Sequence, residues 1–168
     1  MPFSDSLLNL AGFAFAHAIW SVSDLPNGEL LVPLAIVEKA GQRQLLRFEA
    51  ESQEKAIADG KATLAEHEQE LDAWVFVREG QINENGLYVD ALTIEAKSRE
   101  NSSSIVFVQR FQPFASGKFK LLGPPSAVVG NKALSEQEGV PLVARLLKGA
   151  QTHSKAAGHW REWSAHDA

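Results

Sequence analysis

The stretch that decides the fold runs from Asp72 to Leu122 and reads DAWVFVREGQINENGLYVDALTIEAKSRENSSSIVFVQRFQPFASGKFKLL. Apolar residues recur in it with a period of two, and polar turn residues separate the apolar segments. A period of two is typical of strands that bury one face. The sequence therefore predicts an antiparallel meander of three or four strands, over residues 73–79, 87–97, 105–112 and 118–122.

The first half of the chain gives a mixed pattern. Ser4 or Ser6 is placed to cap a short helix that Gly12 would end. Large side chains then alternate with alanines, which predicts a strand over residues 13–20, and a helix continuing to Trp20 is the competing interpretation. Two further strands are expected over residues 29–38 and 43–49. Pro33 has no N–H for a strand ladder, so we expect the strand that contains it to lie at an edge or to be bulged.

Two longer helices complete the pattern. Ser52 is placed to cap a helix over residues 53–70, and Pro141 suits the first position of a closing helix. The order is helix, three strands, helix, three or four strands, helix. It predicts an α+β fold with a mostly antiparallel sheet of six to seven strands and helices packed on one face or end. We expect one domain over residues 1–151, followed by a tail over residues 152–168.

Composition narrows the classes of function. The chain has 168 residues, of which 45% are hydrophobic and 22% are charged, as in an ordinary globular protein. Its net charge of −5 disfavours binding to nucleic acid. It has no cysteine, which excludes disulfides, thiolate nucleophiles and cysteine zinc sites, and fits a reducing cytoplasm. The apolar run over residues 7–18 is too short to span a membrane, and a secretory signal is the less favoured alternative for it. We expect no membrane association and no cofactor.

One set of residues has the chemistry of a metal-dependent enzyme. Glu95 and Lys97 lie two apart on a predicted strand and so share a face, and Asp72 precedes the neighbouring strand. This pattern resembles the metal-dependent nucleases of the PD-(D/E)xK class. The resemblance implies that Asp72 and Glu95 hold a metal ion while Lys97 polarises water. The simpler reading is that Glu95 and Lys97 form a weak pair at the end of a strand.

Histidines provide further candidates. His17 lies among apolar residues and would serve as a general base, as a ligand or as a hydrogen-bonded core residue. His67 and Glu70 have helical spacing but no third ligand beside them, so we expect no metal site there.

The tail is rich in aromatic and imidazole rings. It contains Trp160 and Trp163, and also His153, His159 and His166. Two tryptophans three residues apart share a helix face and are costly to leave in water. We expect Trp160, Trp163 and His159 to bind the sheet, another subunit or another protein.

Two hypotheses follow. The first is a non-catalytic interaction module that binds a protein partner or a second copy of itself. The element order is similar to that of small secretion-chaperone-like domains, which bind partners through such sheets. The second hypothesis is a metal-dependent phosphodiesterase or nuclease that uses Asp72, Glu95 and Lys97.

Overall fold

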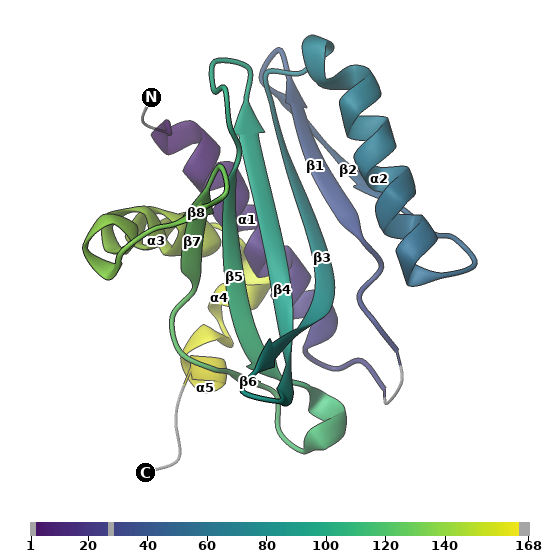
Figure 1. The fold of residues 1–168 in the computed structure, drawn as a ribbon, viewed down its shortest axis with the longest axis vertical. Helices are drawn as coiled ribbons and strands as arrows, with labels where there is room; N and C mark the ends of the chain where they lie inside the picture. Colours follow the sequence, from purple (N-terminus) through teal and green to yellow (C-terminus); the bar gives the residue numbers. More distant parts are fainter. Residues whose placement is uncertain (1–2, 27–28, 165–168) are drawn as a thin grey trace.

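A computed structural model describes residues 3–26 and 29–164 (Figure 1). In this part of the chain an eight-stranded antiparallel sheet has the order β2-β1-β3-β4-β5-β7-β8, with β6 paired to β5. The strands are β1 (Leu34–Lys39), β2 (Gln42–Arg47), β3 (Ala73–Glu84), β4 (Leu87–Ser98), β5 (Ile105–Gln112), β6 (Lys120–Leu121), β7 (Ser126–Val129) and β8 (Lys132–Ala133). The helices are α1 (Asp5–Val22), α2 (Gln53–His67), α3 (Glu136–Ala150), α4 (Ser154–Ala157) and α5 (Trp160–Ser164).

The α+β architecture predicted from the sequence is confirmed. The strands β3, β4 and β5 form the expected meander, and β3 and β4 are long strands joined by a tight turn at Asn85 and Gly86, both with positive φ. The short strands β7 and β8 follow Pro125 and were not expected. They extend the sheet beyond β5.

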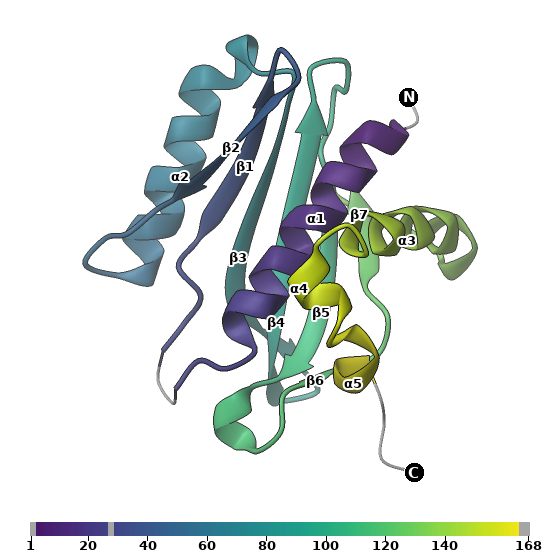
Figure 2. The same cartoon turned by 180° about the vertical axis from the view of Figure 1, so that it is seen from behind.

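The predicted strand over residues 13–20 is wrong, because α1 is a continuous helix. Ser4 caps it, since the backbone N–H of Leu7 donates to the Ser4 Oγ at 3.1 Å. The helix is apolar on nearly every side because the sheet covers one side and α3 and α4 cover another (Figure 2). A helix that is buried on most of its sides shows little amphipathic period. The alanines of α1 therefore produced a pattern in the sequence that resembles the alternation of a strand.

Gly12 lies in the middle of α1 and does not end it. A Cβ atom at Gly12 would lie 2.0 Å from the carbonyl oxygen of Leu146 in α3. A Cβ atom at Gly149 would lie 2.6 Å from the carbonyl oxygen of Asn9 in α1. The two helices therefore pack backbone to backbone, and glycine is what permits this approach.

We expected Pro33 to lie within a strand over residues 29–38 that is at an edge or bulged. That prediction is wrong, because the strand begins after Pro33 and is not at an edge of the sheet. Pro33 precedes β1, which lies between β2 and β3, and β2 is the edge strand. The Pro33 carbonyl accepts a hydrogen bond from the Phe48 N–H at 2.9 Å. Residues 29–33 are not in a strand.

The helix α2 lies on the opposite face of the sheet from α1 (Figure 1). Ser52 caps it as predicted, accepting from the Lys55 N–H at 3.1 Å. A small second core joins it to β1 and β3, through Ala35, Val37, Leu64, Leu71 and Phe76. The Phe76 ring would lie 2.5 Å from a Cβ at Gly60, so this glycine permits the close approach of α2 to the sheet.

The closing helix α3 begins at Glu136, five residues before Pro141. Ser135 and Glu138 form a capping box at its start, which satisfies the first free backbone N–H groups. Pro141 lies inside the helix and was wrongly expected to begin it.

The tail packs on the domain over the residues that the structure describes. Trp163 is 6% exposed and contacts Phe119 edge-on, with ring centroids 5.7 Å apart. Trp160 packs edge-on against Phe15 in α1 at 5.3 Å. His166 lies outside the described residues.

Candidate functional site

The three residues of the nuclease-like pattern have separate partners. Asp72 accepts a hydrogen bond from the Ala40 N–H at 2.8 Å and lies 3.5 Å from the Arg99 guanidinium. Lys97 donates to Glu68 at 2.7 Å, and this contact lowers the pKa of the Glu68 carboxyl. Glu95 accepts from the Ser104 hydroxyl at 2.7 Å.

The register of the sheet explains why these residues do not meet. The Asp72 carbonyl accepts from the Arg99 N–H, so Asp72 lies opposite Arg99. Glu95 lies four residues before Arg99 along the same strand direction, which is about 13 Å. Among residues 3–26 and 29–164, no three His, Asp or Glu side chains are grouped to hold a metal ion. The structure therefore does not bring Asp72 and Glu95 together.

The tail residues singled out from the sequence contact the domain and one another. His159 stacks on Trp163 with ring centroids 5.4 Å apart, and its Nδ1 lies 3.8 Å from Glu162. Trp160 and Trp163 contact each other edge-on at 6.0 Å. The apolar surface of Trp163 is thus already covered by this chain.

A different set of rings and cations meets on the outer side of α1. We call it the His17 surface. It consists of Phe13, His17 and Trp20 of α1, Arg43 and Arg47 of β2, and His153 and Lys155 at α4. The offsets of four and three residues place the α1 members on one helical stripe. These residues come from three segments that lie far apart in the sequence.

The centre of the His17 surface is a pair of imidazoles. His17 Nδ1 lies 3.1 Å from His153 Nε2. The Ala156 N–H donates to His153 Nδ1 at 3.1 Å, so His153 Nδ1 carries no proton. A neutral His153 then carries its proton on Nε2 and donates it to His17 Nδ1. This leaves the proton of neutral His17 on Nε2.

Both imidazoles have a lowered pKa, which favours their neutral form. Burial lowers the pKa of His17, and His153, Arg47 and Lys155 act in the same direction. Burial likewise lowers the pKa of His153, with Lys155 adding to the effect. In the described part of the chain no acceptor is bound to His17 Nε2. The half-exposed His17 ring therefore offers one N–H to a ligand.

Cations lie around these rings. The Lys155 Nζ lies 4.7 Å from the Trp20 ring centroid, and the Arg43 Cζ lies 5.8 Å from that of Phe13. Arg43 also pairs with Glu38 at 3.3 Å. Among the residues that the structure describes, Arg47 is not in an ion pair. The surface thus combines positive charge with aromatic faces.

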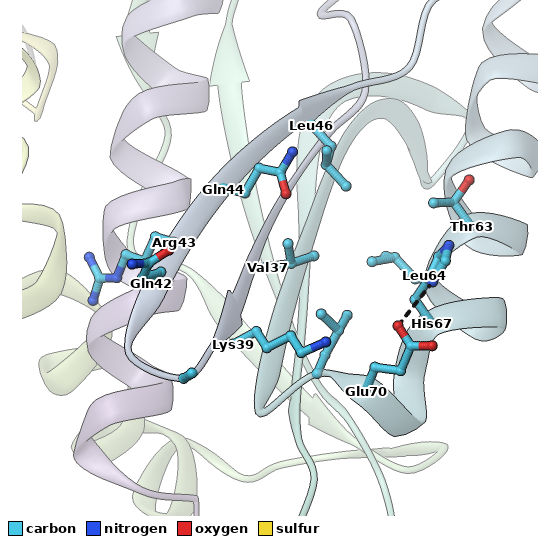
Figure 3. A pocket seen from close by; sticks show the side chains of 12 residues that line it. Val37, Lys39, Gln42, Arg43, Gln44, Leu46, Thr63, Leu64, His67 and Glu70 are labelled. Carbon is cyan, nitrogen blue, oxygen red and sulfur yellow. Dashed lines mark ion pairs between the residues drawn. The ribbon is translucent and has the colours of Figure 1, made fainter.

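The other side of β2 borders a large cavity. This α2 pocket has a volume of about 890 Å³ and lies between the β1–β2 hairpin and α2 (Figure 3). Its lining includes Val37, Gln44, Leu46, Thr63, Leu64 and Leu71. Arg43 borders it as well, but its side chain points away toward α1 (Figure 3). His67 and Glu70 lie 3.5 Å apart at its α2 side, as an exposed pair.

Sequence reasoning identified His17 as a candidate but missed its surroundings. His153 lies 136 residues away, so no local pattern joins the two imidazoles. The spacing of Phe13, His17 and Trp20 was the available signal, because it matches a helix and not a strand.

The fold and this site together describe an α+β protein in which helices cover an antiparallel sheet and a cationic, aromatic surface lies beside an edge strand. No protein-family model matches the sequence, and no solved structure matches it. Over 116 residues, 68% of its length, the chain is 34% identical to the cobalamin biosynthesis protein CobD of Chromobacterium violaceum. The chain spans about a third (33%) of the length of that protein. In the two described ranges, no helix has the length and apolar character that crossing a membrane requires.

Proposed function

We propose that this protein is a non-catalytic interaction module that binds an acidic segment of a protein partner at the His17 surface. The observation that carries the proposal is the meeting of Arg43, Arg47 and Lys155 with half-buried aromatic rings around His17. Such a surface attracts carboxylates and offers apolar contact beside them. The His17 Nε2–H adds a neutral donor.

An acidic protein segment suits this surface better than a nucleic acid. The net charge of the chain is −5, so the positive surface is local and a long phosphate backbone would also meet repulsion. Arg43 and Arg47 lie on one face of a six-residue strand, which matches a short segment with a few carboxylates. We favour a protein partner over self-association, and a complex of two copies is an alternative outcome of the tests below.

The similarity to CobD is compatible with this proposal. A match that spans about a third of that protein fits a unit that occurs within longer chains. The role in cobalamin biosynthesis that the name states belongs to that protein, and we propose no cobalamin chemistry here. A cytoplasmic location, as the cysteine-free composition favours, is part of the proposal.

The test is binding of fluorescein-labelled poly-L-glutamate, measured by fluorescence anisotropy at low and at physiological salt. The double variant Arg43→Gln with Arg47→Gln should weaken binding about tenfold at low salt, since each partly exposed charge pair contributes up to about 1 kcal/mol. Added salt should weaken binding by the wild-type protein.

A matched control removes two exposed positive charges elsewhere. Lys61→Gln with Lys118→Gln changes α2 and the loop before β6 by the same net charge. This control should retain most of the binding. Equal losses in the two double variants would mean that net charge alone attracts the probe, and the proposed site would be wrong.

A further inference from the structure

The edge strand β2 has a free side. It stands at the end of the sheet and pairs with β1 alone in the described part of the chain. Five of its six residues are exposed; it contains no proline or lysine, and its charged residues are Arg43 and Arg47. A free edge presents backbone N–H and C=O groups to an added strand, and two arginines on it favour a strand that carries negative charge.

The two faces of β2 meet two different environments. Gln44 and Leu46 lie opposite Val37 and Ala35 of β1 and face the α2 pocket. Arg43, Leu45 and Arg47 face the α1 side, and Leu45 is 44% exposed. Because side chains alternate along a strand, an added neighbour would place its own residues alternately on the same two sides.

We infer that the acidic partner binds as an extended strand paired with the free edge of β2, with carboxylates opposite Arg43 and Arg47 and apolar side chains at the mouth of the α2 pocket. This inference rests on the proposed function and specifies the partner. Addition of a strand to a sheet edge gives affinity through backbone hydrogen bonds and specificity through alternate side chains.

The register fixes the pattern of the partner segment. Arg43 and Arg47 lie four residues apart, so the two acidic residues that face them are also four apart. The residue between them on that face meets Leu45 and is apolar. The two residues on the other face lie opposite Gln44 and Leu46 and point to the pocket. The segment is therefore five residues long, acidic at each end and apolar at the three central positions, and this pattern reads the same in both chain directions.

The experiment uses labelled peptides with the whole protein. The probe has the core sequence glutamate, leucine, valine, leucine, glutamate, with a threonine at each end. A shuffled peptide of the same composition places both glutamates together at one end. A third peptide has the probe sequence with N-methyl groups on its three central residues, which removes backbone donors on both edges.

We expect the probe to bind at least tenfold more tightly than either comparison peptide. Leu45→Glu should weaken probe binding at least tenfold, because it places a carboxylate between the two acidic positions. Leu87→Glu is its matched control, since Leu87 is 72% exposed at the β3–β4 turn, and should leave probe binding unchanged. Thr63→Phe, which narrows the α2 pocket, should weaken binding of the probe several-fold and leave poly-L-glutamate binding unchanged.

The outcomes separate the two proposals. Equal binding of the probe, shuffled and N-methylated peptides would overturn strand addition and leave the acidic surface in place. If poly-L-glutamate also fails to bind, the proposed function itself is wrong. Analytical ultracentrifugation would detect a probe-dependent dimer in which two copies of the chain pair through their β2 strands. That result would likewise overturn pairing between β2 and the peptide.

Discussion

The crossing of α1 and α3 supports a quantitative prediction about Gly12. In an open helix, glycine to alanine stabilises by about 1 kcal/mol, because glycine has a poor helix propensity. Here the added Cβ would lie 2.0 Å from the Leu146 carbonyl oxygen and 2.7 Å from the Ala150 nitrogen. Ordinary contact begins at 3.4 Å, so the helices would have to separate by about 1.4 Å.

That separation decides the sign of the effect. Both neighbours are helix backbone, which cannot move aside as a side chain can. Overpacking usually costs about 1–3 kcal/mol, and loss of contact along two buried helices adds to it. We expect Gly12→Ala to lower the free energy of unfolding by about 2–4 kcal/mol, since the packing cost exceeds the propensity gain.

The assay is urea unfolding followed by circular dichroism. Gly139→Ala in α3 is the control, because nothing lies within 4 Å of a Cβ there, and it should be neutral or stabilising. The separation should also break the contact between His17 and His153, since α4 follows α3 directly, and nitrogen NMR shifts of the imidazoles report this. A Gly12→Ala protein as stable as wild type would refute the backbone-to-backbone packing of these helices.

Two further predictions concern pH. The lowered pKa values of His17 and His153 mean that the unfolded chain takes up protons near pH 6.5 while the folded chain does not. The stability that comes from the neutral imidazoles is therefore present in full above pH 6.5 and falls as the pH drops. His17→Phe should reduce the slope of the unfolding free energy against pH by less than about 1 kcal/mol per pH unit, because solvent screens the half-exposed ring. Urea unfolding between pH 7.5 and 5.5 measures it, and an unchanged slope would contradict the pairing. Burial raises the pKa of Glu79, which is 6% exposed and accepts from the Leu31 N–H at 2.9 Å. The buried protonated carboxyl of Glu79 therefore contributes to stability below pH 4.5, the ordinary pKa of glutamate, and this contribution is lost as the pH rises and the carboxyl ionises. Because glutamine stays uncharged, Glu79→Gln should raise the melting temperature by about 2–4 °C at pH 7.5 and by less at pH 4.

The sequence predicted the meander well because its signal is local. In β4, Ile94 and Ala96 are fully buried while Glu95 and Lys97 are partly exposed, and this alternation of apolar and charged residues is visible in the sequence itself. Antiparallel neighbours joined by a tight turn need no information from elsewhere in the chain. The strands β4 and β5 were therefore predicted to within one residue of their bounds, whereas β3 continues five residues beyond its predicted end, to Glu84.

The helix α1 was misassigned for the opposite reason. Its surroundings, and not its own sequence, determine which of its sides are apolar. Ala14, Ala16 and Ala18 are all fully buried although they point in different directions around the helix. The small side chains are needed because the sheet, α3 and α4 approach from several sides, and none of these neighbours is visible from residues 13–20.

The helical state of α1 is what creates the proposed site. In a strand, Phe13, Phe15, His17 and Ile19 would share one face. In the helix, Phe15 and Ile19 are fully buried, while Phe13, His17 and Trp20 form a separate, half-exposed stripe. The buried residues fix the rotation of α1 and thereby hold the stripe toward β2 and α4. An acidic strand at the edge of β2 would then meet rings and cations that are already in position, so less side-chain entropy is lost on binding.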